Sequence, residues 1–421
     1  MTEKLLQFIW QNRLFNSREL QLHSGEPVSI LKTGSWNHHQ GPDFSNGLVR
    51  IGNTLWAGHI ELHLLCSDWY RHAHAGDPHY GNVVLHVVWE NDLSAPPPIP
   101  LLILRDRIPH FLLDRYEEWM SRNQFIPCAS QLSQVDSLAW LHWKERLLME
   151  RLERKMEKIR VCLQENGQHW EETCWWLLAR NFGLPVNADS FEQIARSLPV
   201  VLLARQKSVL VNLEALLLGQ AGLLEKEFSD AYPRLLQREY RFMQKKYGLQ
   251  PLQHPLCFLR MRPENFPGLR LAQLASLIQK STHLFSCIRS AGSWRELQQL
   301  FDVTANDFWH YHYVLDESSA FKPKRLGKTM QQNLLINTAI PLLFTYGYLQ
   351  GDRNLTQKAL DWLSEMPSES NHIIDGFSSI GISSASAADS QSLKELKTSY
   401  CEAKRCLECG AGYALLRNTI A

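Results

Sequence analysis

The sequence predicts an α/β domain at the N-terminus, followed by a mainly α-helical region. Short runs of β-branched and aromatic residues fill the first 130 residues, whereas later segments show helical periodicity and almost no strand signal. The chain has 421 residues, of which 44% are hydrophobic, and this is enough for two or three domains with their own cores. We therefore predict an α/β core at 1–130, a helical domain at 131–365 and a loop with a cysteine-rich tail at 366–421.

The α/β core is predicted to contain one helix and about five strands. Leu5, Leu6, Ile9 and Trp10 fall at helical spacing, which predicts an opening amphipathic helix over 3–14. Runs bounded by Gly, Pro, Asn or Asp predict strands at 27–32, 48–51, 56–65, 83–89 and 101–104. The prolines of 96–100 cannot belong to a central strand, so they form a stiff connector.

The helical region is predicted from long stretches with a period of about 3.6 residues. These cover 138–164, 169–181, 190–198, 205–218, 228–247, 271–280, 334–348, 355–365 and 392–396. Ser, Gly and Ala dominate 371–389, which predicts a loop there.

Charge and cysteine content exclude several classes of protein. With 44 basic and 43 acidic residues the net charge is +1, so no global field attracts nucleic acid or anionic membranes. No apolar run approaches the roughly 20 residues of a spanning helix, and Glu3 and Lys4 interrupt any signal-peptide core. Nine cysteines, an odd number, do not indicate a secreted disulfide framework. We expect a cytoplasmic protein without a membrane partner, and the sequence does not predict its oligomeric state.

The densest group of chemically active side chains lies between residues 37 and 90. Glu61 and His63 alternate along a predicted strand, so both side chains point to one face of the sheet. Asp43, near the start of the preceding strand, provides a second carboxylate. Two carboxylates from adjacent strands suit Mg²⁺ or Mn²⁺, and His63 can orient or deprotonate water. We predict Asp43, Glu61 and His63 as catalytic residues, with the two carboxylates as metal ligands.

Other polar residues of this stretch are predicted to orient the carboxylates or to contact substrate. They are His59, Asp68, His72, His74, Tyr80 and His86. The alternative interpretation is structural, with Asp68 forming a turn and His86 buried in an apolar strand beside a bonded neighbour.

A basic group around the predicted helix at 271–280 suits contacts with phosphates and bases. It comprises Arg262, Asn265, Arg270 and Gln273, with His254, Arg260 and the basic residues of 321–328 nearby. The alternative is a solvated, structural segment made rigid by Pro263 and Pro267.

The end of the chain carries a cysteine motif of the kind that binds zinc or an iron–sulfur cluster. Cys401, Cys406 and Cys409 have the spacing C-x4-C-x2-C, and a fourth ligand is needed. Cys128, Cys257 or a histidine can supply it. The alternative is three reduced structural cysteines.

Several sequence strings resemble a bacterial family catalogued as domain of unknown function 2851. They are GHIELH at 58–63, DWYRHAH at 68–74, NVVLHVV at 82–88, GPDF at 41–44, RPENFP at 262–267, RLAQLA at 270–275 and the cysteine-rich end. The likeness extends over nearly the whole chain, and it implies no assigned activity.

A more distant resemblance concerns the PD-(D/E)XK nuclease-like fold, which is the fold of restriction endonucleases. The order of a helix, a strand, a strand opening after Pro42-Asp43 and a strand with Glu61-x-His63 is similar to that fold. The resemblance implies a metal-dependent phosphodiester hydrolase acting on DNA or RNA, and some nucleases of this fold also hold an iron–sulfur cluster with four cysteines. His63 replaces the lysine of the pattern and lacks its permanent positive charge.

Two alternatives follow from this difference. One is a non-catalytic module on the same fold that binds nucleic acid or protein. The other is a histidine-rich metalloenzyme of different chemistry, with zinc or iron held by several of the histidines.

Overall fold

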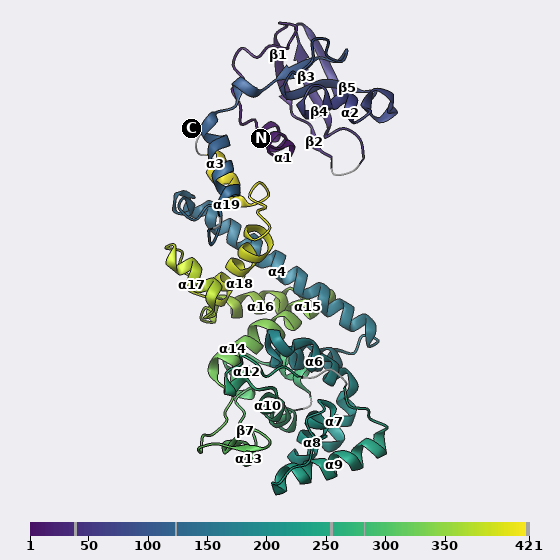
Figure 1. Ribbon diagram of the computed structural model, residues 1–421, viewed down its shortest axis with the longest axis vertical. Coiled ribbons are helices and arrows are strands. Elements are labelled where there is room, and N and C mark those ends of the chain that lie inside the picture. The colour runs from purple at the N-terminus through teal and green to yellow at the C-terminus, as the bar shows by residue number, and fades with distance from the viewer. Residues whose placement is uncertain (38–39, 123, 253–255, 282, 418–421) are drawn as a thin grey trace. The chain divides into compact units, whose positions relative to one another are not determined.

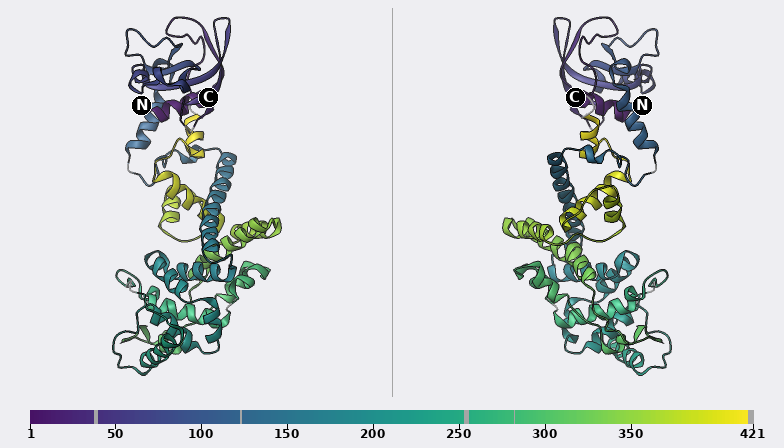
Figure 2. Two further views of the ribbon diagram at one scale, coloured as in Figure 1. Left: turned by 90° about the vertical axis from the view of Figure 1, so that its right-hand side faces the viewer. Right: turned by 90° about the vertical axis from the view of Figure 1, so that its left-hand side faces the viewer.

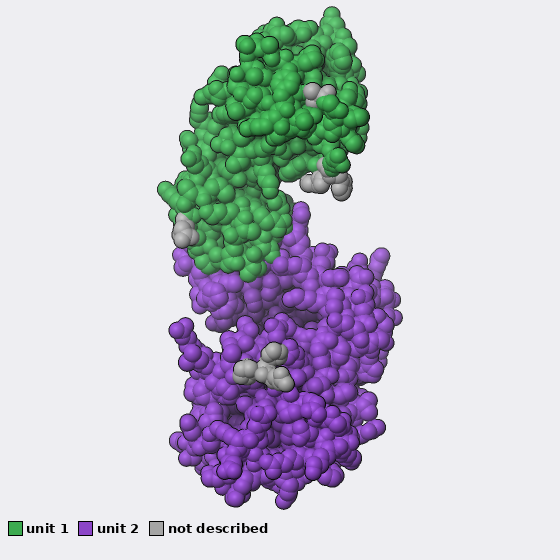
Figure 3. Space-filling model, turned by 45° about the vertical axis from the view of Figure 1, so that its right-hand side comes forward, with its two compact units in different colours: residues 1–143, 396–421 green, residues 144–395 purple. Residues whose placement is uncertain are grey.

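The computed structural model describes residues 1–37, 40–122, 124–252, 256–281 and 283–417, and the chain divides into two units. Unit 1 comprises Met1–Trp143 with Leu396–Ala421, and unit 2 comprises Lys144–Glu395 (Figure 3). The C-terminal segment therefore belongs to the same unit as the N-terminal sheet. The domain boundaries predicted at residues 130 and 365 describe segments that fold independently, and they stay a prediction.

A mixed sheet lies at the centre of unit 1 (Figure 1). Within the described residues its six strands are β1 (Val28–Lys32), β2 (Ser35–Trp36), β3 (Phe44–Ile51), β4 (Thr54–Leu65), β5 (Val83–Glu90) and β6 (Leu101–Ile103). The order is β1-β3-β4-β5-β6, and β2 also pairs with β3. Pairing is antiparallel from β1 to β4 and parallel from β4 to β6. The predicted helix followed by a sheet is thus present.

Helix α1 (Glu3–Gln11) precedes the sheet and packs against β4. The Thr2 side chain caps it by accepting a hydrogen bond from the Leu5 backbone, and Leu6, Ile9 and Trp10 are fully buried. Burial of this apolar stripe fixes the helix on the sheet.

Two parts of the sheet depart from the predicted strands. The strand expected at 48–51 begins earlier, at Phe44. Its first half was missed because Asn46 has a φ of 57° and the register with β4 shifts between Phe44 and Gly47, so the side chains there do not alternate regularly. The connection from β4 to β5 contains helix α2 (Asp68–Arg71) and two short 3-10 turns, His74–Gly76 and Pro78–Tyr80.

Unit 1 also contains the helices α3 (His110–Ser121) and the C-terminal α19 (Gly410–Arg417). Figures 1 and 2 show α19, in yellow, beside α3, and the Arg115 guanidinium donates to the Leu415 carbonyl at 2.7 Å. Helix α4 (Ser137–Glu165) begins in unit 1 and continues into unit 2.

In the part of unit 2 that the structure describes, helices are accompanied by one short hairpin of β7 (His312–Val314) and β8 (Glu317–Ser318). Its further helices are α5 (Trp170–Phe182), α6 (Leu184–Ser197), α7 (Val200–Gln206), α8 (Leu210–Gln220), α9 (Ala231–Tyr247), α10 (Pro267–Lys280), α11 (Leu284–Ser290), α12 (Trp294–Leu300), α13 (Asp307–His310), α14 (Lys328–Leu334), α15 (Ile340–Gln350), α16 (Arg353–Glu365), α17 (His372–Ser379) and α18 (Ala387–Glu395). Within the described residues, no helix combines the length and the apolar character needed to cross a lipid bilayer.

The loop predicted over 371–389 is wrong, because this segment contains α17 and the start of α18. The Asn371 side chain caps α17 by accepting from the backbone N–H groups of Ile373 and Ile374. Both isoleucines and Phe377 are buried, so tertiary packing stabilises a helix whose composition alone favours a loop.

Candidate functional site

Asp43 and Glu61 lie side by side, with Asp43 directly before β3 and Glu61 in the antiparallel neighbour β4. Phe44, the first residue of β3, faces Ile60 of β4, which brings Asp43 next to Glu61. The Asp43 backbone N–H donates to Glu61 Oε2 at 2.9 Å, and the Leu62 N–H donates to Asp43 Oδ2 at 3.1 Å. Each carboxylate is therefore fixed by the backbone of the other strand.

A glutamine from α1 holds the remaining oxygen of Asp43. Gln7 is 8% exposed, and its Nε2 donates to Asp43 Oδ1 at 2.8 Å. Sequence reasoning did not identify this residue as part of the site. The available signal was a polar side chain next to the apolar stripe of an amphipathic helix.

Three imidazoles gather beside Glu61. His63 Nε2 and His74 Nε2 each lie 3.4 Å from Glu61 Oε1, and His72 Nδ1 lies 3.2 Å from His63 Nε2. One ring nitrogen from each of His63, His72 and His74 can be chosen so that all three lie within 4.8 Å of one another. His63 is buried, whereas His72 is exposed, so this histidine cluster reaches the protein surface.

His86 and two aromatic rings enclose the buried side of the cluster. His86 lies opposite Glu61 in the parallel pairing of β5 with β4, and its Nε2 is 2.9 Å from His63 Nδ1. Tyr80 stacks on His74 with ring centroids 3.8 Å apart. Trp69, which sequence reasoning did not single out, packs against two imidazoles. Its ring centroid lies 5.4 Å from that of His74 and 5.2 Å from that of His86.

Two other predicted site residues have different surroundings. Asp68 accepts a hydrogen bond from the Leu65 backbone and pairs with Arg71, so its carboxylate stabilises the turn after β4. The His59 backbone N–H binds the Asn82 carbonyl, and His59 Nδ1 is buried without a recorded hydrogen-bond partner in the described part of the chain.

Burial shifts the protonation equilibria toward neutral forms. It raises the pKa of Glu61 well above its usual range, and the Asp43 charge raises it further. Burial also raises the pKa of Asp43. It lowers the pKa of His63 to about 2, with His86 and His74 adding to the effect, and lowers the pKa of His86 to about 4. The buried imidazoles are therefore neutral at neutral pH, and they present lone pairs rather than positive charge.

The donor set fits a divalent cation in two ways. Asp43 and Glu61 offer the oxygen ligands that Mg²⁺ and Mn²⁺ prefer, with the remaining positions filled by water. His63, His72 and His74 offer ring nitrogens, which zinc, iron and other first-row transition metals prefer.

The cysteines of the tail share a pocket with Cys128, one of the candidate fourth ligands. Cys128, Cys401, Cys406 and Cys409 line one small, mostly apolar pocket in unit 1. Burial raises the pKa of Cys128 to about 12, and Cys409 and Cys406 raise it further because their thiols lie nearby. Cys257 is exposed and belongs to unit 2.

The backbone around these thiols is closely packed. A Cβ atom at Gly412 of α19 would lie 2.1 Å from the Cys406 carbonyl oxygen, so the approach of α19 to this segment requires glycine. The hydrogen bond from Arg115 of α3 to the Leu415 carbonyl of α19 joins this C-terminal segment to the N-terminal part of unit 1.

The predicted basic group lies in unit 2. Arg262, Asn265, Arg270 and Gln273 line a common cavity there. His254 lies outside the described residues.

The chain belongs to the family described as "Protein of unknown function (DUF2851)", whose model matches residues 3–372. No curated protein and no solved structure matches the sequence.

Proposed function

We propose that unit 1 is a metal-dependent phosphodiester hydrolase with a core of restriction-endonuclease type, acting on DNA or RNA. The observation that carries the proposal is the pair of backbone hydrogen bonds that joins Asp43, directly before β3, to Glu61 and Leu62 of β4, with His63 on the same face as Glu61. The order of elements also supports it, because α1 is followed by antiparallel strands and then, through α2, by the parallel strand β5.

In this proposal Asp43 and Glu61 hold Mg²⁺ or Mn²⁺, which would polarise a phosphoryl oxygen and lower the pKa of a bound water. Neutral His63 accepts a hydrogen bond from the attacking water, and its contact with His86 fixes the orientation of its ring. Gln7 keeps the Asp43 carboxylate in position. Tyr80 and Trp69 exclude water from the buried side of the imidazoles.

The test is cleavage of labelled single- and double-stranded DNA and RNA by the full-length protein in Mg²⁺, Mn²⁺ or EDTA. We expect cleavage in Mn²⁺ or Mg²⁺ and none in EDTA. Absence of cleavage with every substrate, under conditions in which the protein binds Mn²⁺, would contradict the proposal.

A second candidate function is a transition-metal centre built on nitrogen ligands. The convergence of three histidine nitrogens within 4.8 Å favours it, because hard Mg²⁺ does not need imidazole ligands. Metal analysis distinguishes the two candidates. Stoichiometric zinc or iron that is retained through dialysis and lost in His74→Ala supports the nitrogen-ligand centre.

We also propose that Cys128, Cys401, Cys406 and Cys409 hold zinc or an iron–sulfur cluster. Their shared pocket supports this, and binding would convert buried thiols into metal-bound thiolates. Such a site would join the C-terminal segment of unit 1, which carries three of the cysteines, to the segment around Cys128, without taking part in hydrolysis.

A further inference from the structure

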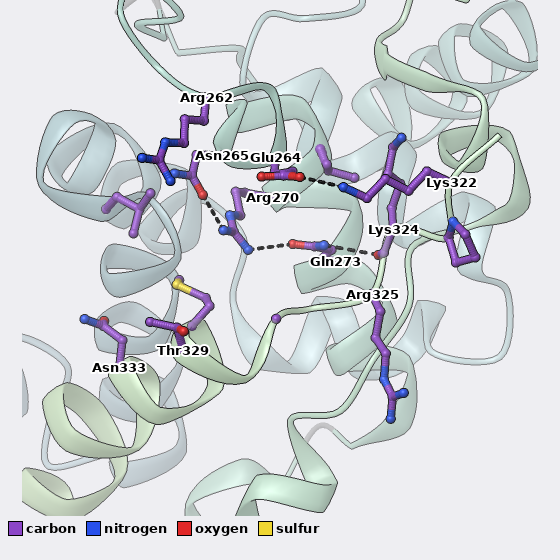
Figure 4. A pocket seen from close by; sticks show the side chains of 15 residues that line it. Arg262, Glu264, Asn265, Arg270, Gln273, Lys322, Lys324, Arg325, Thr329 and Asn333 are labelled. Carbon is purple, nitrogen blue, oxygen red and sulfur yellow. Dashed lines mark hydrogen bonds and ion pairs between the residues drawn. The ribbon is translucent and has the colours of Figure 1, made fainter. Parts of the chain in front are cut away.

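A separate cavity of about 520 Å³ lies in unit 2 (Figure 4). Its walls come from the 262–265 turn, α10, the extended segment 322–327 and the start of α14. The described residues that line it include five basic side chains and one acidic one. They are Arg262, Arg270, Lys322, Lys324 and Arg325, with Glu264 as the acid.

Arg270 is the most deeply placed of the guanidinium groups. It is 7% exposed, and two neutral amides orient it, since it donates to Gln273 Oε1 at 2.9 Å and to Asn265 Oδ1 at 2.5 Å (Figure 4). Its Nε atom is buried and has no hydrogen-bond partner in the described part of the chain. A buried charge without a counterion is costly. Arg270 is such a charge, because no acidic side chain in the described part of the chain forms an ion pair with it.

The one acid of the cavity does not neutralise Arg270. Glu264 is exposed and pairs with Lys322, at 2.6 Å between Nζ and Oε1. Arg325 pairs with Asp302. Across residues 124–252, 256–281 and 283–417 no ion pair is recorded for Arg262 or Arg270. The cavity therefore retains an excess of positive charge.

Fixed hydrogen bonds hold the cationic wall in place. Gln273 Nε2 donates to the Lys324 carbonyl at 3.1 Å, which ties α10 to the 322–327 segment and leaves Gln273 Oε1 for Arg270. Lys324 is 3% exposed and its ammonium lies 3.5 Å from the Tyr313 ring centroid, so its charge is also buried in this wall. Thr329 and Asn333 of α14 add polar side chains to the cavity lining.

We propose that this cavity binds a small phosphorylated molecule about the size of a mononucleotide, with the phosphate on Arg270 and Arg262. A guanidinium presents N–H groups in a planar fork that matches phosphate oxygens, and Arg270 Nε is available for such a contact. Thr329 and Asn333 then face the rest of the ligand.

A small ligand fits better than a polymer for two reasons. The cavity volume lies within the range of about 300 to 1,000 Å³ typical of small-molecule sites. Contacts to a nucleic-acid backbone come mainly from exposed lysines and arginines along a surface, whereas Arg270 is almost fully buried inside a cavity.

The test measures binding to the full-length protein by calorimetry and by thermal shift at constant ionic strength. The probes are inorganic phosphate, adenosine monophosphate, adenosine and a 20-nucleotide oligonucleotide. We expect phosphate and adenosine monophosphate to bind and to raise the melting temperature, and adenosine to have no effect. Binding of the oligonucleotide alone would overturn the proposal in favour of a polymer.

The matched variants are Arg270→Gln and Arg262→Gln, with Arg238→Gln as the control. Arg238 is an exposed residue of unit 2 that pairs with Glu239 and does not line the cavity. We expect at least tenfold weaker binding of adenosine monophosphate in each cavity variant and unchanged binding in the control. Arg262 is exposed, so Arg262→Gln should fold and keeps the test informative even if Arg270→Gln does not fold. The proposal is refuted if Arg262→Gln, and Arg270→Gln where it folds, bind adenosine monophosphate with wild-type affinity.

Discussion

The Asp43 backbone N–H donates to Glu61 Oε2 at 2.9 Å, while the N–H of Leu62, next to Glu61, donates to Asp43 Oδ2 at 3.1 Å. This reciprocal pair holds the buried Glu61 and the half-buried Asp43 carboxyl groups side by side, so ionisation of both would place two negative charges next to each other. The arrangement is unfavourable without a compensating cation, because burial and mutual repulsion both oppose ionisation. Loss of one carboxylate should therefore weaken cation binding, whereas the stability of the metal-free protein should not fall.

Glu61→Gln keeps the shape of the side chain and the acceptor for the Asp43 N–H, and removes the carboxyl group that would ionise when a cation binds. We expect the affinity for Mn²⁺ to fall by at least about tenfold, as when a group that supports a metal is lost. Nuclease activity should disappear, and the metal-free melting temperature should stay equal or rise. Calorimetry, cleavage assays and thermal melts measure these effects. Asp106→Asn, at an exposed position of unit 1, is the control and should match the wild type. Full activity in Glu61→Gln would exclude its role as a ligand.

His63→Lys separates the two candidate metal centres. The introduced ammonium would lie near Glu61 Oε1, which is 3.4 Å from the present His63 Nε2, and would supply the permanent charge that the nuclease pattern expects. We expect Mn²⁺-dependent cleavage to be retained or increased. If the nitrogen-ligand centre is correct, the same variant should lose its bound zinc or iron. Measuring cleavage and metal content on one preparation decides between them, with His110→Lys, at an exposed position, as the control.

The fold of unit 1 is predictable where runs of β-branched and aromatic residues are bounded by turn-forming residues, as they are in β4 and β5. Asn46 is different, because its positive φ and the nearby register shift depend on contacts between strands that local sequence does not encode. Helix α17 was missed for a related reason. Its serines and glycine favour a loop, and the buried Phe377 outweighs that local preference.

Part of the candidate site was also predictable, namely the part that lies on regular strands. A period of two places Glu61 and His63 on one face, and the antiparallel neighbour of their strand brings Asp43 beside Glu61. His72 and His74 come from an irregular turn in which Ala73 adopts a φ of 58°, so no periodic pattern could place both imidazoles at His63.

Cys406→Ser tests whether the cysteine pocket holds a metal. If four thiolates bind one ion or cluster, its binding free energy contributes to folding, and loss of a ligand should lower stability by several kcal/mol. Unfolding in denaturant, with zinc, iron and sulfide analysis of anaerobically purified protein, measures this. Cys257→Ser, which changes an exposed thiol of unit 2, is the control and should have little effect. A metal-free protein whose stability does not respond to chelators would leave four ordinary thiols.

Glu214 provides a test of pH dependence away from both metal sites. It lies fully buried on α8, and its Oε2 accepts hydrogen bonds from Tyr232 Oη at 2.8 Å and Trp309 Nε1 at 3.1 Å. Burial raises its pKa from 4.5 to about 7, although these bonds oppose the shift. The folded state therefore binds this proton more tightly than the unfolded state does.

Because the folded pKa of Glu214 lies above the unfolded one, its contribution to the free energy of unfolding falls as pH rises from about 4.5 to about 7. The loss is on the order of 3 kcal/mol, from about 1.4 kcal/mol per pKa unit. Glu214→Gln carries no titrating group, so we expect the stability of the variant relative to the wild type to increase by that amount between pH 4.5 and pH 8. Denaturant unfolding at both pH values measures it. Glu227→Gln, at an exposed position of the same unit, should keep the wild-type pH profile. If Glu214→Gln also keeps that profile, Glu214 is already ionised in the folded protein at neutral pH, and its two hydrogen bonds outweigh the cost of burying its charge.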